Sequence, residues 1–229
     1  QMCIRDRTKG ELYDFLRKKD ATTFIHHDNP YLMNISQRLN LISYGTEDDL
    51  YVNGRITGNS PYLAFEWKAG KDGELHQVCT QLIGEYNFPN ALAAITIGRF
   101  FGVEAKKIDE ALAEYTPQNN RSQLKKTEDN TLIIDAYNAN PTSMMAALQN
   151  LRNMTVPHKM LILGDMRELG ADSPAEHQKI VDYIKESDFE TVWLVGEQFA
   201  ASEHSFKTYA NVQEVIKDLQ ENKPKGYTI

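Results

Sequence analysis

The sequence has little cysteine. Only Cys3 and Cys79 occur among the 229 residues, and no C-x-x-C spacing is present. Two thiols so placed give neither a disulfide framework nor a zinc site, and they suit a reducing compartment. The chain also lacks any run of the roughly 20 apolar residues that a bilayer span requires, and its N-terminus has no apolar signal core. We therefore expect a cytoplasmic protein that is not inserted in a membrane.

The chain also has fewer basic than acidic residues, 25 Lys and Arg against 32 Asp and Glu. The formal net charge is -7 and the pI is near 5.4, whereas nucleic-acid and anionic-membrane surfaces need clustered Lys and Arg. No nucleic-acid partner is expected, although a local basic pocket for phosphate remains open.

Several chemical signatures are also absent. No G-x-x-x-x-G-K-[ST] phosphate loop is present, and no Ser-His-Asp or Cys-His set stands out. His26 and His27 are adjacent on an expected strand and point to opposite faces, so they cannot share a metal ion. Lys106 and Lys107 are interpreted as solvated surface.

What is present indicates a globular α/β protein of one or two domains, with two the preferred number. Apolar residues make up 41% and charged residues 25% of the chain, which provides for a sizeable core. Between Thr22 and Gly84 the pattern is β-rich, with Asn53-Gly54 and Asp72-Gly73 interpreted as turns and the second as a hairpin. The expected strands lie at residues 24–26, 41–45, 62–67 and 75–83. Helical spacing follows over residues 88–101 and 103–115.

After residues 118–121 the pattern alternates between short apolar runs and amphipathic stretches. Strands are expected at residues 131–137, 160–164 and 192–196, and helices are expected from Pro141 and Pro174. A βαβαβ order with apolar runs of this length predicts a parallel, Rossmann-like sheet covered on both faces. Gly226 to Ile229 has the pattern of the beginning of a further strand.

The first candidate site is the segment GEYNFPNALAA, residues 84–94. Asn87 fits a helix N-cap, Pro89 fits the first turn, and Asn90 lies one turn on. Two side-chain amides at a helix start offer the donor and acceptor that an adenine edge requires, but capping alone is the stronger interpretation of the spacing. Arg121, in NNRSQ, either binds phosphate bidentately or is a solvated arginine, and for a lone Arg the second is favoured.

The strongest motif is DAYNANP, residues 135–141, after the apolar run 132–134. Asp135 would lie at the carboxyl end of a buried parallel strand, where open α/β sheets bind ligands and Asp accepts from ribose hydroxyls. A buried strand end is a costly place for an idle carboxylate, which favours a functional role. Asn140 is expected to cap the helix that Pro141 opens.

A fourth motif, LGDMRELG at residues 163–170, also follows an expected strand. Asp165 either lines a cleft between domains or turns the chain, and the sequence weighs these alternatives equally. Ser173 and Glu176 are expected to form a capping box with Pro174 at the first helical position, so Glu176 is interpreted as structural.

Together NRSQ, DAYNANP, LGDMRELG and the Glu176-His177 pair resemble the Mur ligases, specifically the MurF type, over residues 8–229. The resemblance implies a C-terminal part of the central ATP-binding domain at 8–117 and a truncated Rossmann-like C-terminal domain at 118–229. Residues 1–7 are interpreted as a non-native segment.

The resemblance also assigns site residues. It implies that Asn87 and Asn90 lie by adenine, that Arg121 reaches the ATP phosphates, and that Asp135 holds ribose. Lys9, in T-K-G-E, would be the family's carbamoylated lysine, which helps bind Mg²⁺ through its carbamate. Asn138, Asn140 and Asp165 are expected at the substrate cleft.

The implied chemistry is ATP-dependent amide formation on peptidoglycan precursors. The family phosphorylates the carboxylate of UDP-MurNAc-tripeptide, and the amine of D-Ala-D-Ala attacks the acyl phosphate, with Mg²⁺ and cationic groups stabilising charge. A monomer is expected. The rival hypotheses are another Mur or folylpolyglutamate-type ligase and a noncatalytic nucleotide-binding module.

We expect the 229-residue chain alone to lack ligase activity, because the resemblance places the phosphate-loop lysine, the magnesium-binding Glu and His and the UDP-sugar domain before Thr8. A combined ATP-hydrolysis and ligation assay with UDP-MurNAc-tripeptide checks this. Turnover above background by the purified chain would contradict it.

Overall fold

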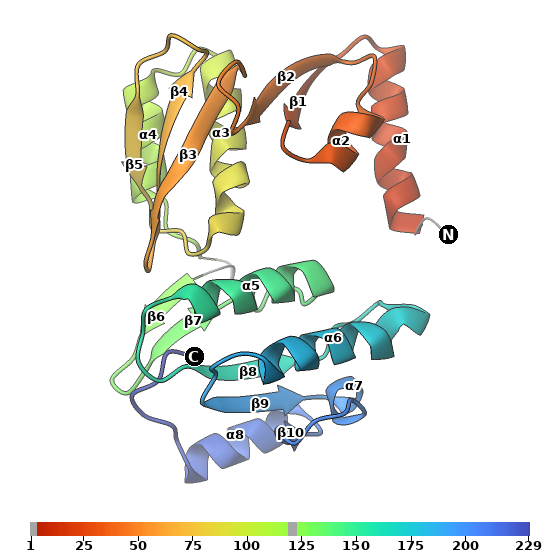
Figure 1. The fold of residues 1–229 in the computed structure, drawn as a ribbon, viewed down its shortest axis with the longest axis vertical. Helices are drawn as coiled ribbons and strands as arrows, with labels where there is room; N and C mark the ends of the chain where they lie inside the picture. Colours follow the sequence, from red (N-terminus) through yellow and green to blue (C-terminus); the bar gives the residue numbers. More distant parts are fainter. Residues whose placement is uncertain (1–3, 119–122) are drawn as a thin grey trace. The chain divides into compact units, whose positions relative to one another are not determined.

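The computed structural model describes residues 4–118 and 123–229, with side chains from residue 10 onward (Figure 1). The chain divides into two compact units, residues 1–81 with 85–115 and residues 82–84 with 116–229. Arg121 lies outside the described residues. Within the described part, no helix is long and apolar enough to cross a membrane.

Unit 1 holds a five-stranded mixed sheet in the order β1-β2-β3-β4-β5. The first three strands are parallel and the last three are antiparallel to their neighbours. Helix α3 packs across β1 to β4, and α4 packs on β5 (Figure 1). Its elements are α1 (Ile4–Lys18), β1 (Thr22–His26), α2 (Pro30–Ile35), β2 (Asn40–Gly45), β3 (Val52–Asn59), β4 (Leu63–Ala69), β5 (His76–Cys79), the 3-10 turn η1 (Glu85–Asn87), α3 (Phe88–Phe100) and α4 (Ala105–Glu114).

The sequence-based prediction for this unit is wrong at one strand. Asn53-Gly54 is not a turn, because both residues lie inside β3 and pair with Lys68 and Trp67 of β4. Glycine is required there for close packing: a Cβ on Gly54 would lie 2.4 Å from the carbonyl oxygen of Glu66 and 3.2 Å from Leu92 of α3. The Asp72-Gly73 hairpin between β4 and β5 is confirmed, although β5 is shorter than expected.

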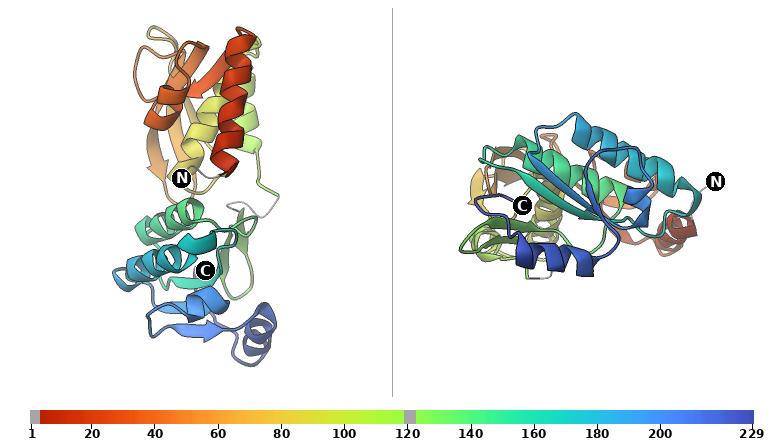
Figure 2. Two further views of the ribbon diagram at one scale, coloured as in Figure 1. Left: turned by 90° about the vertical axis from the view of Figure 1, so that its right-hand side faces the viewer. Right: turned by 90° about the horizontal axis from the view of Figure 1, so that it is seen from below.

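Unit 2 is built of three layers, with α5 and α6 on one face of the strands and α8 on the other (Figure 2). Strands β8 and β9 are parallel, as predicted, and β10, which was not predicted, pairs in parallel with β9. The unexpected strand β6 pairs antiparallel with β7, so the sheet is not purely parallel. The elements are β6 (Gln123–Lys126), β7 (Thr131–Ile134), α5 (Pro141–Asn153), β8 (Met160–Gly164), the 3-10 turn η2 (Gly170–Asp172), α6 (Ser173–Lys185), β9 (Thr191–Val195), α7 (Glu197–Ala200), β10 (Lys207–Tyr209) and α8 (Val212–Glu221).

The segment Tyr227 to Ile229 joins the two parts of this sheet. Thr131 N donates to Tyr227 O (2.9 Å) and Ile133 N to Ile229 O (2.7 Å) on one side, and Met160 N donates to Thr228 O (2.9 Å) on the other. The bridges to both neighbours are parallel. The extended segment expected at Gly226 to Ile229 is thus confirmed, and it lies between β7 and β8, whose carboxyl ends share one edge.

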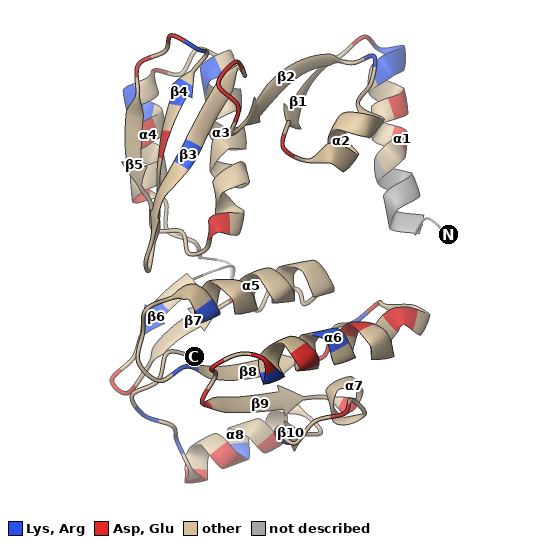
Figure 3. Ribbon diagram, in the orientation of Figure 1, with Lys and Arg blue, Asp and Glu red and all other residues tan. Residues whose placement is uncertain are grey.

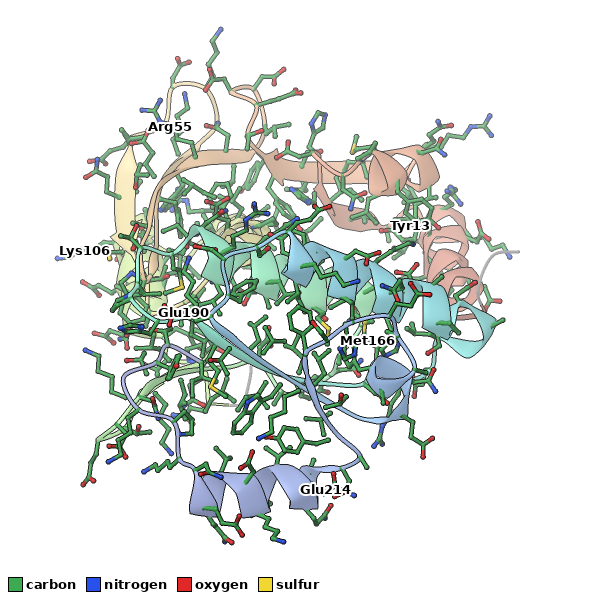
Figure 4. All side chains as sticks on the ribbon, turned by 60° about the horizontal axis from the view of Figure 1, so that its bottom comes forward. Tyr13, Arg55, Lys106, Met166, Glu190 and Glu214 are labelled. Atoms are coloured by element: carbon green, nitrogen blue, oxygen red, sulfur yellow. The ribbon has the colours of Figure 1, made fainter. Side chains whose placement is uncertain are left out.

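Apolar burial holds the layers of unit 2 together. Side chains from α5, α6, β8, β9 and α7 form one continuous cluster between the helices and the sheet. Its most buried members are Leu148, Met166, Ile180, Val181, Ile184, Leu194 and Phe199. Met166 is labelled in Figure 4. Charged residues of both signs are interspersed on α4, α6 and α8 (Figure 3). Among them, Lys106 and Lys107 pair with Glu110 and Glu104 on the exposed face of α4, which confirms the surface interpretation.

Asp109 fixes α4 to the sheet of unit 1. Trp67 Nε1 donates to its Oδ1 (2.8 Å), and His76 Nδ1 lies 2.7 Å from its Oδ2. Replacing Asp109→Ala leaves the buried indole N–H of Trp67 without its acceptor, which should lower the free energy of unfolding by about 2 kcal/mol. Urea denaturation measures this. Glu110→Ala, on the exposed side of the same helix, is the control and should change stability by less than about 0.5 kcal/mol. Equal losses in both variants would contradict the prediction.

Asp218 anchors α8 to β10 and makes this attachment pH-dependent. Its carboxylate accepts hydrogen bonds from Lys207, Tyr209 and Asn222, and these bonds, that of Lys207 foremost, hold the pKa of Asp218 well below its ordinary value of 3.8. A depressed pKa stabilises the fold above the ordinary value, and the contribution disappears as the pH falls toward the folded-state value. Between pH 5 and pH 3 the melting temperature should therefore fall less in Asp218→Asn than in the parent chain. Parallel curves would show that the anchor is not the titrating group.

Candidate functional site

The DAYNANP segment connects β7 to α5 at the carboxyl edge of the unit 2 sheet. Asp135 directly follows β7, and it lines, with Asn138, the mouth of a cavity of about 290 Å³ between β7, β8 and α5. Both residues are exposed. The expectation of a buried strand end at Asp135 was therefore wrong, and the argument from the cost of an idle buried carboxylate falls away. Its position at the carboxyl end of a strand stands.

Asn140 is the N-cap of α5, as predicted. Its Oδ1 accepts from Ser143 N (3.0 Å), and the backbone N–H of Asn140 donates in return to Ser143 Oγ (3.3 Å). This reciprocal pair satisfies two N–H groups at the helix start. The amide of Asn140 therefore serves the helix and fixes the loop that carries Asp135 and Asn138.

Asp165 follows β8 at the same edge of the sheet. Its two carboxylate oxygens accept from the backbone N–H groups of Gln198 and Phe199, both at 3.0 Å, at the start of α7. Gly196 leaves room for this carboxylate, because a Cβ there would lie 2.2 Å from Asp165 Oδ2. These two bonds show that Asp165 fixes the chain at the start of α7, and its position at a substrate cleft stays a prediction.

His177 is a residue of this edge whose role the sequence reasoning missed. Its ring is fully buried. Nε2 accepts from Met166 N (3.0 Å), so Nδ1 carries the proton and donates to Ser173 O (2.8 Å). Asp165 Oδ1 lies 3.7 Å from Nε2. The ring thereby fixes the loop after β8 to α6. The available signal was the i, i+4 spacing of Ser173 and His177 on the predicted helix.

The capping box expected at Ser173 and Glu176 is wrong. Ser173 is the first residue of α6, Asp172 occupies the N-cap position, and the cap side chain makes no bond to the helix. Ser173 Oγ instead donates to Gln198 Oε1 (2.9 Å), and Glu176 pairs with Lys179. The 3-10 turn η2 before α6 shifts the helix start, which is why the pattern misled.

The two asparagines of unit 1 lie together at the start of α3. Asn90 Nδ2 donates to Asn87 Oδ1 at 3.3 Å. Asn87 has helical backbone angles and its side chain does not cap the helix, because η1 runs directly into α3. Asn87 thus occupies the predicted N-cap position of α3, but it makes no side-chain capping bond. Pro89 lies in the first turn, as predicted.

The described residues provide no metal site: no group of three or more His, Cys, Asp or Glu among them could hold an ion. His26 and His27 lie near different carboxylates, those of Asp28 and Glu47. Lys9 lies in α1, and its side chain is not among those described. No group of donors among the described side chains thus fits Mg²⁺.

Comparisons with known proteins cover both units. The model of the Mur ligase middle domain matches residues 6–98, and that of the Mur ligase glutamate ligase domain matches residues 120–224. The UDP-N-acetylmuramoyl-tripeptide–D-alanyl-D-alanine ligase of Bacillus subtilis is 33% identical over 63% of this chain and 34% of its own length. That of Escherichia coli is 34% identical over 62% of this chain and 30% of its own length. This chain thus spans about a third of these relatives.

Solved structures show the same fold. MurF from Acinetobacter baumannii has a TM-score of 0.78 at 23% identity and covers 97% of this chain and 50% of its own. MurF from Thermotoga maritima, in complex with ADP, also gives 0.78, at 19% identity, over 98% of this chain and 53% of its own. Folylpolyglutamate synthase from Thermotoga maritima gives 0.63 at 12% identity, over 95% and 54%, so the fold is shared beyond one activity.

Together the two domain models span most of the sequence, in the order middle domain then glutamate ligase domain, and they include the described candidate residues of both units. The chain therefore belongs to the Mur ligase family.

Proposed function

We propose that this chain is part of an ATP-dependent ligase that adds D-Ala-D-Ala to UDP-MurNAc-tripeptide. The activity is proposed for the whole protein, because the chain spans only about a third of its curated relatives. The observation that carries the proposal is the DAYNANP connection: Asp135 at a carboxyl strand end, held by a helix that Asn140 caps. Open α/β sheets bind ligands at such edges.

The choice of D-Ala-D-Ala over other amino substrates rests on sequence, not fold. The relatives at 33% and 34% identity are both named as D-alanyl-D-alanine ligases, whereas the folylpolyglutamate synthase is similar at 12% identity. This favours the dipeptide ligase over the folate-type rival. The ligase names also favour an enzyme over a noncatalytic nucleotide-binding module.

Different residues would bind different parts of the nucleotide. Asp135 would accept hydrogen bonds from the ribose hydroxyls, and the hydrogen-bonded amides of Asn87 and Asn90 would offer donor and acceptor to adenine. Arg121 would meet the phosphates as a bidentate donor. That a related MurF was solved with ADP agrees with a nucleotide site in this fold.

The proposed reaction transfers the terminal phosphoryl group of ATP to the substrate carboxylate. The dipeptide amine attacks the resulting acyl carbon, and the tetrahedral intermediate releases phosphate as the amide forms. The described residues contribute binding and orientation: Asp135 holds the nucleotide, while Asp165 and His177 fix the loop after β8, beside which Asn138 would meet substrate. Mg²⁺, with a carbamoylated Lys9 helping to hold it, belongs to the proposal for the whole enzyme, as do a cytoplasmic location and a monomeric state.

Asp135→Asn in the full-length ligase tests the nucleotide assignment. Because a charge-assisted hydrogen bond is lost, KM for ATP should rise about tenfold, with KM for the dipeptide unchanged. Steady-state kinetics with each substrate varied separates the two. Asp182→Asn, on the exposed face of α6, is the matched control and should behave as the parent. An unchanged KM for ATP in Asp135→Asn would remove Asp135 from the site.

A further inference from the structure

A polar cavity of about 250 Å³ lies against β3 and β4 of unit 1. Phe65 and Trp67 of β4 contact Phe88 of α3 and Asp109 of α4. Because side chains alternate between the two faces of a strand, Glu66 points to the opposite face, away from both helices. The cavity therefore lies on the face of the sheet that α3 and α4 leave uncovered, and we call it the β3–β4 pocket.

Four polar side chains in two cross-strand pairs form the floor of this pocket. Asn53 is paired with Lys68, and Arg55 with Glu66, in the antiparallel register of β3 and β4. Figure 3 shows a basic residue on each of these two strands. The connection between β2 and β3 and the segment before β5 supply the walls, which include Thr46, Asp48 and Leu75. Although they face away from the helices, Asn53 and Glu66 are only 4% and 8% exposed, so the floor is shielded from solvent.

Two oxygen atoms of the floor lack a hydrogen-bond donor. Arg55 Nε donates to Glu66 Oε1, and Asn53 Nδ2 donates to Asp48 O (3.0 Å). Among the described residues, no group donates to Glu66 Oε2 or to Asn53 Oδ1. A shielded acceptor in this state costs free energy, so both oxygens favour a ligand that carries N–H donors. An ammonium group, which has three donors, can satisfy both of them.

Arg55 presents the complementary group. Its Nε is held by Glu66, whereas its Nη1 and Nη2 make no hydrogen bond within the described part of the chain. The edge of the guanidinium formed by Nη1 and Nη2 is therefore available as a bidentate donor to a carboxylate. The Arg55 side chain is 77% exposed, so a ligand can reach this edge. Lys68 Nζ already lies 3.1 Å from Asp48 Oδ1, which leaves Arg55 as the cation for the carboxylate of a ligand.

We propose that the β3–β4 pocket binds the zwitterion of a small α-amino acid. The α-ammonium donates to Glu66 Oε2 and Asn53 Oδ1, and the α-carboxylate accepts two hydrogen bonds from Arg55. Because Arg55 and Glu66 are in direct contact, they match opposite charges carried by the same carbon atom better than the widely separated termini of a peptide. A short side chain lies against Leu75. The proposal does not depend on the ligase activity.

NMR titration of the 229-residue chain with glycine tests the proposal. The backbone amides of Gly54 and Arg55 and the side-chain amide of Asn53 should shift as glycine binds. Glycinamide lacks the carboxylate and N-acetylglycine lacks the ammonium, so each should bind at least tenfold more weakly than glycine. Arg55→Lys keeps the charge but removes the bidentate donor, and it should weaken glycine binding by a similar factor. Arg38→Lys, at another exposed arginine of unit 1, is the matched control and should bind glycine as the parent chain does.

Several outcomes would overturn the proposal. Equal affinity for glycine and N-acetylglycine means that Arg55 binds an anion and that the pocket does not select a zwitterion. The absence of shifts at Asn53, Gly54 and Arg55, or equal glycine affinity in Arg55→Lys and the parent chain, means that the pocket holds no amino acid. Glu66→Gln should weaken the binding of glycine but not that of N-acetylglycine. If this variant does not fold, the two analogues and the exposed Arg55→Lys change still decide the result.

Discussion

The backbone pairing of Tyr227 to Ile229 with both β7 and β8 is the constraint on which unit 2 depends. The residues of this short segment are the last of the sequence, yet they bond to strands that begin about 100 and 70 positions earlier. The turn at Asp129 and Asn130 supports them: Lys223 and Lys225 pair with the Asp129 carboxylate, which lowers its pKa, and Tyr227 N donates to Asn130 Oδ1. Because the pairing is parallel, the carboxyl ends of β7 and β8 share one edge of the sheet. Asp135 directly follows β7 and Asp165 directly follows β8, so both aspartates lie at that edge.

At this edge of the sheet, Asp135 and Asp165 have different environments. Both carboxylate oxygens of Asp165 accept hydrogen bonds from backbone N–H groups at the start of α7. Asp165 also packs beside the buried, neutral His177, and these contacts together fix the conformation of the loop after β8. Asp135 is exposed and lines the cavity between β7, β8 and α5, on a connection whose far end Asn140 secures. Precise ligand binding requires that an accessible carboxylate be held in position by the rigid residues around it. The motif that most clearly identifies the family therefore contains a helix cap at Asn140 as well as Asp135, the residue proposed to bind ribose.

The sequence predicted those parts of the fold in which one local signal dominates. The helices at Phe88 and Pro141, the cap at Asn140 and the strands β8 and β9 have strong apolar periodicity or unambiguous turn chemistry. The sequence-based prediction failed where a residue with a strong local preference serves tertiary packing instead. Gly54 is a turn residue by type but serves the approach of α3 to β3, and Ser173 heads a helix whose true cap lies one residue earlier. Strand β6, Gln123 to Lys126, is too short and polar to register. The roles proposed for Asn87, Asn90 and Arg121 came from the family resemblance, because their local patterns alone favoured helix capping and a solvated arginine.

We propose above that this chain belongs to an enzyme that joins a dipeptide, not a single amino acid, to a UDP-linked tripeptide. Mass spectrometry of the product formed by the full-length protein, offered D-Ala-D-Ala and single amino acids together with ATP and UDP-MurNAc-tripeptide, tests it most directly. We expect one product, heavier than the substrate by the dipeptide less one water, with one phosphate released for each amide formed. A product that carries a single amino acid, or nucleotide binding without any product, would contradict it.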